Sequence, residues 1–202
     1  MASYPDVVNH VKGVIPFQWA CEQKIIKTEF GDGTESRRLI WQSARRNVSI
    51  QYKFLSLYDT HIIYDFYRKR NGPYELFSFF FPQTKTYTKE YCGTSDGTEI
   101  GINLPSLIDD EIIPMNYYLY AGDSLISPSL YTLVNNGGPD GEDYLYLNGG
   151  FHFNAGVKYY WTFTGRLKTK VRFDDSPIEI DEVKDQYASF TINLIGLKAE
   201  LI

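Results

Sequence analysis

The chain has 202 residues, a formal net charge of −5 and a rich set of aromatic side chains, with 17 Tyr, 13 Phe and 3 Trp. This length suits one domain with an insertion or two small domains, and it is sufficient to bury a hydrophobic core. The acidic balance excludes a general nucleic-acid-binding protein, which needs a dense basic surface. The many aromatic residues and the few helical patterns favour a mostly β protein.

Neither a membrane-spanning segment nor a signal peptide is recognisable. The apolar runs are all shorter than the roughly 20 residues that cross a bilayer. The first residues, Met1 to Asp6, lack the basic and apolar regions of a signal peptide. We therefore expect a protein that is made in the cytosol and does not insert into a membrane.

The first clear pattern is a β-hairpin near the N-terminus, after an irregular, proline-interrupted lead-in. Apolar and polar residues alternate loosely from Trp19 to Phe30, and Gly31-Asp32-Gly33 is a turn signal. A second strand is predicted from Glu35 to Trp41. This second arm carries Arg37 and Arg38.

A strictly alternating strand is predicted from Asn47 to Phe54, with one buried face and one face that is wet or meets a partner. The buried set is Val48, Ile50, Tyr52 and Phe54. A helix is predicted over 56–71, because Ser56 and Asp59 form a capping pattern. Its apolar stripe is Leu55, Tyr58, Ile62, Ile63, Phe66 and Tyr67, and Arg68, Lys69 and Arg70 precede the stop signal Asn71-Gly72-Pro73.

An aromatic strand from Tyr74 to Phe81 follows, and the character of the chain then changes. Short strands separated by turn signals are predicted at Asn116–Ala121, Ser129–Val134, Tyr144–Leu147 and Val157–Thr164. Alternation returns in Leu167–Phe173 and in a last strand with Phe190, Ile192 and Leu194, which we interpret as completing the first sheet. The predicted fold is α+β and mostly β: an antiparallel β-sandwich with one capped helix, formed by residues 1–85 and 164–202, and a small β domain inserted at 86–163.

No constellation of residues predicts catalysis, a metal site or a cofactor. His10, His61 and His152 lack metal-ligand spacing, and Cys21 and Cys92 lack a CxxC motif, so two free thiols are expected, although a disulfide stays open. Asp140-Gly141-Glu142-Asp143 lacks the alternating ligands of a calcium loop and is more typical of a hairpin loop. Asp109-Asp110-Glu111 is more typical of an acidic loop than of paired glycosidase carboxylates. Nucleotide-binding and nucleophile motifs are not found.

A basic patch stands out in this acidic chain. Four arginines flank one tryptophan within ten positions: Arg37, Arg38, Arg45 and Arg46 around Trp41. Arginine and tryptophan are enriched in protein interfaces, and arginine pairs bidentately with carboxylates. A protein interface is therefore favoured over nucleic-acid contact, and a solvated strand face remains an alternative for each arginine.

Several of these segments, in this order, resemble the distal tail protein family of tailed bacteriophages and gene transfer agents. The segments are Phe17, Trp19 and Glu22, then Asp32–Arg38, Trp41–Arg46, Phe66–Gly72 before Phe77-Ser78-Phe79, and finally Phe163–Leu167 and Lys170–Asp175. The last segment is similar to a family pattern that ends in "P-V-R-F-D", with Lys170 where the family commonly has proline. The small β insertion also suits the family.

The resemblance implies a non-enzymatic structural component of the virion tail. Its members form a ring, hexameric in the expected case, that joins the tail tube to the baseplate hub or tail tip around an axial channel. A ring contact is heterologous and needs two complementary patches. We hypothesise that the arginine-rich hairpin and the acidic segments Asp174-Asp175 and Asp181-Glu182 are these patches; the candidate interface residues are Arg37, Arg38, Trp41, Arg45, Arg46, Arg70, Arg172, Asp174 and Asp175.

Two other functions are weighed against the tail ring. The first is a carbohydrate-binding module of the tail tip that contacts host surface glycans through stacking tyrosines, namely Tyr117, Tyr118, Tyr144 and Tyr146; such tyrosines are more often core or strand-face residues. The second is an enzyme that degrades capsule or cell wall, which the lack of a catalytic constellation disfavours. Specific nucleic-acid binding is not expected.

Overall fold

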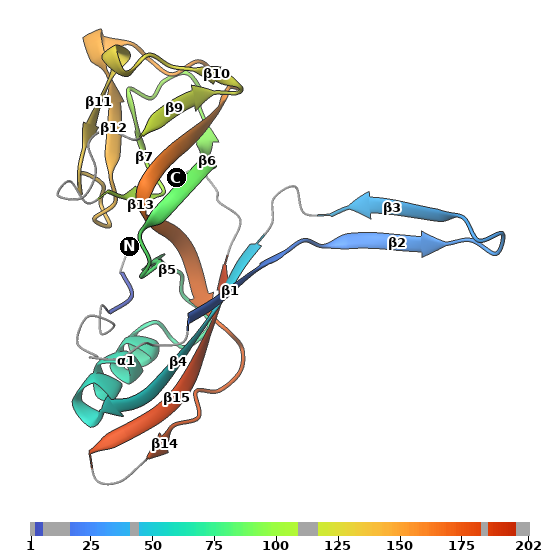
Figure 1. Ribbon diagram of the computed structural model, residues 1–202, viewed down its shortest axis with the longest axis vertical. Coiled ribbons are helices and arrows are strands. Elements are labelled where there is room, and N and C mark those ends of the chain that lie inside the picture. Colours follow the sequence, from blue (N-terminus) through green and yellow to red (C-terminus); the bar gives the residue numbers. More distant parts are fainter. Residues whose placement is uncertain (1–2, 6–16, 41–44, 109–116, 183–185, 197–202) are drawn as a thin grey trace. The chain divides into compact units, whose positions relative to one another are not determined.

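The computed structural model describes residues 3–5, 17–40, 45–108, 117–182 and 186–196. Strands make up 53% and helices 11% of it, which confirms the predicted β-rich α+β class with antiparallel sheets. Figure 1 shows the elements in chain order. The chain divides into two compact units: a terminal unit (Pro5–Leu76 and Lys170–Lys198) and a central unit (Met1–Tyr4, Phe77–Thr169 and Ala199–Ile202).

The predicted limits of an inserted domain, 86 and 163, fall inside two strands. These are β6 (Lys85–Thr94) and β13 (Lys158–Phe173), and β13 runs for 16 residues where the sequence pattern suggested two separate strands. The pattern is broken by Gly165, but that glycine lies within the strand. A Cβ atom at Gly165 would lie 2.6 Å from the carbonyl oxygen of Leu107, so the glycine is required by close backbone packing rather than by a turn.

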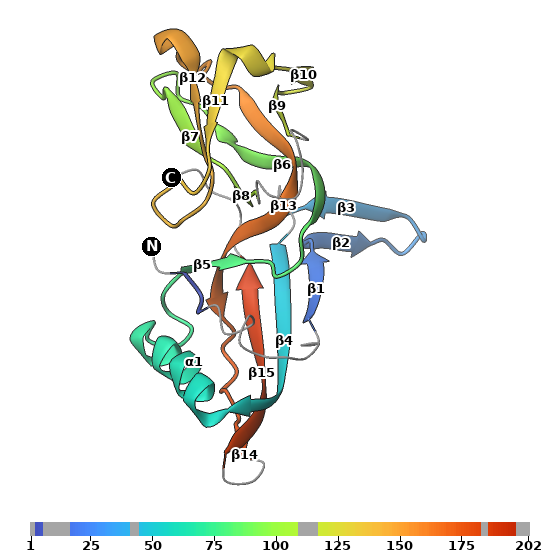
Figure 2. The same cartoon turned by 60° about the vertical axis from the view of Figure 1, so that its left-hand side comes forward.

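Antiparallel strands form the sheet of the terminal unit. In sheet order they are β1 (Phe17–Glu22), β4 (Arg45–Ser56) and β15 (Tyr187–Gly196), and β15 also pairs with the end of β13 and with β14 (Asp181–Glu182). Figure 2 shows β4 and β15 side by side. The side chains that face one another across this pair are buried: Val48, Ile50, Tyr52, Phe190, Ile192 and Leu194. The last strand therefore completes the first sheet, as predicted.

The helix α1 (Leu57–Lys69) follows β4 directly, and its predicted ends are confirmed. The Ser56 Oγ accepts a hydrogen bond from the Asp59 backbone N–H at 3.1 Å, which is the expected N-terminal cap. At the other end Asn71 and Gly72 have φ values of 52° and 62°, the left-handed conformation that terminates helices.

The apolar stripe of α1 faces the sheet. The rings of Phe66 and Tyr67 lie 6.2 Å and 5.0 Å from the ring of Phe173, in edge-to-face geometry. Ile63 is buried on the same helix. The helix therefore packs on the sheet through Ile63, Phe66 and Tyr67. Tyr58, which was predicted to belong to the stripe, is 75% exposed instead, because it lies two residues before the buried Thr60 and so points to the opposite side of the helix.

Phe54 was predicted to lie on the buried face of its strand, but its side chain is exposed to solvent. A bulge shifts the register of β4 against β15 between Ala188 and Phe190, and Phe54 adopts a φ of 57°. Its side chain is 64% exposed, whereas Leu55 is buried. Strict alternation cannot anticipate this, because the extra residue of a bulge changes the phase of the strand.

The strand predicted over Tyr74–Phe81 is shorter than expected, because β5 spans only Phe77–Phe80. Glu75 instead closes the end of α1. Its backbone N–H donates to the Arg70 carbonyl oxygen at 3.2 Å, and its carboxylate accepts from Asn71 Nδ2 at 2.8 Å. These polar contacts end the helix and delay the start of the strand.

The predicted hairpin is confirmed, but the pattern from Trp19 to Phe30 contains two strands in different sheets. β1 belongs to the main sheet, whereas β2 (Ile25–Glu29) and β3 (Glu35–Leu39) form a two-stranded sheet of their own. Asp32 Oδ1 accepts hydrogen bonds from the backbone N–H and hydroxyl of Thr34 and so fixes the turn. Every residue from Gln18 to Arg38 is exposed.

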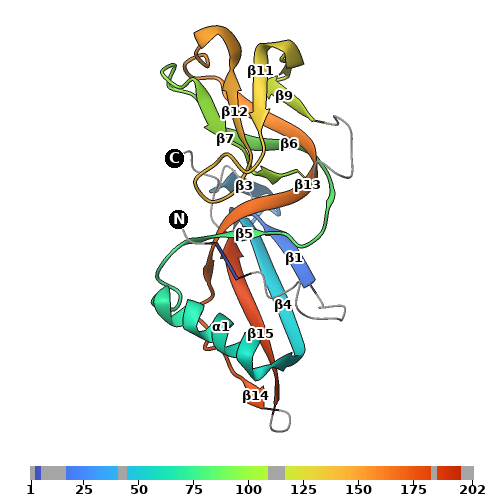
Figure 3. The same cartoon turned by 90° about the vertical axis from the view of Figure 1, so that its left-hand side faces the viewer.

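Several strands of the central unit pair with β13. They are β5, β6, β8 (Ser106–Leu107) and β9 (Tyr118–Ala121), and β10 (Ser124–Leu125) pairs with β9. A second sheet consists of β11 (Tyr131–Val134), β12 (Tyr144–Leu147) and β7 (Gly101–Asn103), which lie side by side in Figure 3. Two 3₁₀ turns, Pro128–Leu130 and Asn148–Gly150, precede β11 and follow β12.

The core of the central unit is built around Trp161, which is fully buried on β13. The rings of Tyr117 and Tyr131 lie 5.3 Å and 6.2 Å from it, and its indole N–H donates to Ser106 Oγ at 3.2 Å. Ser106 Oγ in turn donates to the buried Asp143 carboxylate at 2.7 Å. A chain of hydrogen bonds therefore connects the core tryptophan to Asp143.

Asp143 also accepts hydrogen bonds from the backbone N–H groups of Ile108 at 2.9 Å and Asn136 at 3.3 Å. Replacing Asp143 with alanine is expected to destabilise the chain by about 3 kcal/mol, because three donors lose a buried, charged acceptor. Urea unfolding followed by tryptophan fluorescence measures this effect. The matched control Asp123→Ala removes a fully exposed carboxylate and is expected to leave the midpoint nearly unchanged; equal shifts for both variants would contradict the role of Asp143.

Candidate functional surfaces

The described residues contain no group of three or more His, Cys, Asp or Glu side chains placed to hold a metal ion. None of the helices that the structure describes has the length and apolar character to cross a membrane. His61 is exposed on α1, and His152 contacts the carbonyl oxygen of Thr98 through Nδ1 at 2.8 Å. His10 and the acidic run 109–111 lie outside the described residues.

The two cysteines are free thiols, as predicted. Cys21 is exposed on β1. Burial raises the pKa of the Cys92 thiol far above its ordinary value, and the nearby Glu90 charge adds to this effect. The Cys92 side chain is therefore held as a thiol and is a poor nucleophile.

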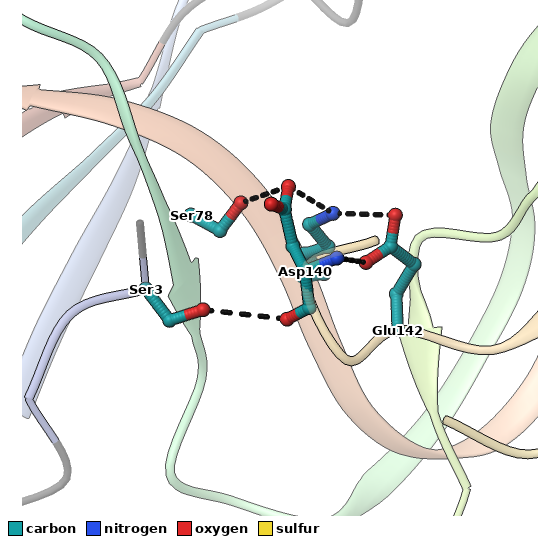
Figure 4. A network of polar contacts seen from close by, with 5 residues as sticks. Ser3, Ser78, Asp140 and Glu142 are labelled. Carbon is teal, nitrogen blue, oxygen red and sulfur yellow. Dashed lines mark hydrogen bonds and ion pairs between the residues drawn. The ribbon is translucent and has the colours of Figure 1, made fainter. Parts of the chain in front are cut away.

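A buried ionic network occupies the segment that the sequence analysis interpreted as a hairpin loop (Figure 4). Lys168 Nζ lies 3.1 Å from Asp140 Oδ2 and 2.8 Å from Glu142 Oε1, and all three side chains are at least nine-tenths buried. Ser78 Oγ donates to the same Asp140 oxygen at 3.0 Å, and Ser3 Oγ donates to the Asp140 carbonyl oxygen at 3.3 Å. The network fastens residues 140–142 to β13 and β5.

The electrostatics of Asp140 reflect this arrangement. Burial opposes ionisation of the carboxyl group, but the hydrogen bonds and positive charge around it, including Lys168 and Ser78, outweigh burial and hold the pKa of Asp140 below its ordinary value of 3.8. A depressed pKa means that the carboxylate stabilises the folded state at neutral pH and that this contribution is lost as the pH falls through the folded-state pKa. These are properties of a structural ion-pair network.

Lys168→Met is expected to destabilise the chain by about 3 kcal/mol at pH 7, because two buried carboxylates lose their common cation. The difference from the wild type should shrink as the pH falls below about 4, where protonation removes the unpaired charges. Urea unfolding at pH 7 and pH 3 measures both values. Lys158→Met, at an exposed position of the same strand, should have little effect at either pH; a pH-independent effect of Lys168→Met would contradict the ionic role.

The Ser3–Tyr4 segment is more ordered than the predicted irregular lead-in. Ser3 forms a parallel bridge with Ser78, and the Tyr4 N–H donates to the Ser78 carbonyl oxygen at 2.8 Å. The Tyr4 ring is buried, and its centroid lies 5.9 Å from the ring centroid of Phe77 and 5.6 Å from that of Phe79. Sequence inspection had no signal for this contact beyond the tyrosine itself.

The candidate interface arginines lie on separate elements of the terminal unit. Arg37 and Arg38 are on β3, and Trp41 lies outside the described residues. Arg45 and Arg46 begin β4, opposite Glu22 and Cys21 of β1, and are half-buried. The local fold therefore contributes to their environment, and they are not simply displayed to solvent.

Other members of that candidate set are paired within the chain. Arg70 Nη1 lies 3.1 Å from Glu75 Oε2, and Arg172 Nη1 lies 2.9 Å from Asp175 Oδ1. Asp174 accepts a hydrogen bond from Ser176 Oγ at 2.9 Å. The structure thus brings Arg172 and Asp175 together as partners of each other.

The two faces of the β2–β3 hairpin differ in chemistry. On one face Lys27 pairs with Glu29 and with Glu35, and Arg37 pairs with Glu35, so these charges are satisfied within the hairpin. On the other face Ile26 lies directly opposite Arg38, and Thr28 lies opposite Ser36. By alternation Phe30 follows on this second face, which we call the open face: Ile26, Thr28, Phe30, Ser36 and Arg38.

The open face exposes large apolar groups. Ile26 and Phe30 are 51% and 52% exposed, and no hydrogen bond or ion pair to Arg38 is found among the described residues. A two-stranded sheet with apolar residues in solvent is marginally stable by itself. This surface is the strongest candidate for contact with another protein.

The candidate stacking tyrosines do not form one platform in the described structure. Tyr117 packs on Trp161, and Tyr144 lies across Gly101, where a Cβ atom would fall 2.0 Å from its hydroxyl oxygen. Tyr118 and Tyr146 are exposed but belong to different sheets.

A row of tyrosines that sequence reasoning missed crosses three strands of the central unit. Tyr91, Tyr160 and Tyr120 occupy paired positions on β6, β13 and β9, so they share one face. The rings of Tyr91 and Tyr160 lie 5.8 Å apart, and Lys89 Nζ lies 5.2 Å from the Tyr120 ring. The pairing of strands distant in sequence, which creates the row, leaves no local signal.

No protein-family model matches the chain, and a search of the curated proteins finds no relative.

Proposed function

We propose that the protein is a structural subunit that assembles with copies of itself into a distal tail ring, which connects a phage-type tail tube to the baseplate hub or tail tip. The observation that carries this proposal is the β2–β3 hairpin, an exposed two-stranded sheet with Ile26 and Phe30 in solvent. Monomeric proteins rarely display such an element, because its apolar residues gain free energy when a partner covers them. The resemblance to distal tail proteins indicates the kind of assembly.

The remaining chemistry is compatible with a connector. A ring with an axial channel through which a genome passes should not hold nucleic acid tightly, and a net charge of −5 provides few phosphate contacts. The function is then mechanical: ordered contacts between subunits make a rigid collar of the virion tail. We propose no catalytic role for the described residues.

The hairpin is the part to remove in a test. The Ile40 N–H donates to the Lys24 carbonyl oxygen at 2.9 Å, so residues 24 and 40 are already paired where a shorter turn could join them. Replacing residues 25–39 with Asn-Gly should close a tight turn and leave the main sheet intact. Sedimentation velocity over a concentration series is expected to show the wild type near six times the 23.3 kDa chain mass and the shortened variant as a monomer.

Circular dichroism and the melting temperature of the shortened variant check that it folds. The matched control is Phe151→Ser, which removes an exposed aromatic residue of the central unit and should assemble like the wild type. Assembly of the shortened variant with the affinity of the wild type would contradict the role of the hairpin. A wild type that stays monomeric at every concentration would contradict self-assembly.

A second candidate function is carbohydrate binding by the tail tip, and the tyrosine row on β6, β13 and β9 favours it. Tyrosine rings stack on the C–H faces of sugars, and the neighbouring Lys89 and Asp123, paired at 2.8 Å, offer hydrogen bonds to hydroxyl groups.

Retention on immobilised host-surface polysaccharide measures this second function. The double variant Tyr120→Ala with Tyr160→Ala is expected to lower retention about 30-fold, since each of the two stacked rings is worth about 1 kcal/mol. Tyr74→Ala, at an exposed position of the terminal unit, is the control. Absence of retention by the wild type, or equal retention by all three proteins, would remove the carbohydrate candidate.

A further inference from the structure

Phe54 combines an unfavourable backbone conformation with exposure to solvent. Its φ of 57° lies in the left-handed region, which bulky L-residues rarely adopt because Cβ approaches the carbonyl oxygen. The four described non-glycine residues with positive φ are Phe54, Asn71, Lys89 and Asn136, and asparagine tolerates this region. Phe54 is the only aromatic residue among them.

Among the described residues, no contact requires a phenylalanine at this position. The Phe54 N–H donates to Ser189 Oγ at 3.2 Å, which holds the backbone of the bulge whatever the side chain is. The side chain itself is 64% exposed. Glycine would accept the conformation without strain, so the phenyl ring is better explained by a contact outside the chain than by folding.

The surroundings of Phe54 define what such a contact would meet. Ser189 on β15 pairs with Asp181 on β14, and its hydroxyl accepts the hydrogen bond from the Phe54 N–H, so Ser189 is next to both Phe54 and Asp181. Tyr187, two residues before Ser189, is 46% exposed, and Asp181 is exposed. We call Phe54, Tyr187 and Asp181 the aromatic patch.

The aromatic patch and the open face of the hairpin are chemically complementary. The patch offers two aromatic rings beside a carboxylate, whereas the open face offers Ile26 and Phe30 beside the Arg38 guanidinium. Apolar contact with an adjacent charge-assisted pair is the usual composition of an energetically important interface centre. Because the two surfaces are different parts of the same chain, a contact between them in two copies is heterologous and continues from one copy to the next.

We propose that the aromatic patch of one copy receives the open face of the β2–β3 hairpin of a second copy. This inference rests on the proposed ring, and it identifies the receiving surface on the neighbouring subunit. In the contact Phe54 packs against Ile26 and Phe30 while Arg38 pairs with Asp181. The strained backbone at Phe54 then serves to place the phenyl ring where the neighbouring copy can contact it.

Two substitutions at the aromatic centre test this contact. Phe54→Gly is expected to raise the melting temperature of the monomer by about 2–4 °C through relief of strain, and to weaken assembly at least about tenfold through loss of the ring. Loss of assembly by a more stable protein cannot be attributed to misfolding. The control Tyr74→Ser removes another exposed aromatic residue of the terminal unit and should change neither quantity.

A charge exchange tests the pairing itself. Arg38→Glu and Asp181→Arg should each weaken assembly, because each places like charges in the contact, and the double variant should recover most of the wild-type affinity. Sedimentation velocity of the full chain measures all variants. Rescue in the double variant supports the proposed contact.

Three outcomes are distinguishable. Wild-type assembly that persists in Phe54→Gly, or single charge variants that are not rescued by combination, would overturn the patch-to-hairpin contact and leave the ring proposal standing. A wild-type protein that remains monomeric would contradict the ring proposal and this inference together. Weakening by Phe54→Gly with rescue by the charge exchange is the expected result.

Discussion

The continuous strand β13 forms backbone hydrogen bonds with strands of both units, and the sheets depend on it. Residues from Lys158 to Leu167 pair with strands of the central unit, and the last three residues of the strand pair with β15 in the terminal unit. Its inward residues, from Tyr159 to Phe173, are the largest contribution to the buried core. Lys168 on the outward side is held by two buried carboxylates, so even the polar positions of the strand are fixed.

Local sequence rules predicted the elements whose causes are local. The cap at Ser56, the stop at Asn71-Gly72, the turn at Asp32 and the alternation of Val48, Ile50 and Tyr52 all appear as expected, because each depends on residues that are neighbours in sequence. The network around Asp140 and Lys168, the tyrosine row and the docking of Tyr4 were not foreseen. Each depends on strands that are far apart in the chain, and a single sequence carries no direct information on which strands pair.

The candidate interface likewise contains features that the sequence predicts and features that only the structure reveals. The hairpin and its arginines were visible in the sequence, but their partners were not: Arg37, Arg70 and Arg172 are engaged within the chain, which leaves Arg38 beside Ile26 as the more informative position. Phe54 was assigned to the buried face because alternation continued through it. Its exposure in a strained bulge violates the local rule, and such violations are most often found where a residue serves function rather than folding.

Imaging of the purified full-length chain by negative-stain electron microscopy, with the mass of the same sample determined by native mass spectrometry, tests the central claim most directly. Self-assembly through the hairpin into a connector predicts closed rings with a central hole and one rotational symmetry, six-fold in the expected case. A compact monomer at every concentration, or a two-fold dimer without a hole, would contradict it.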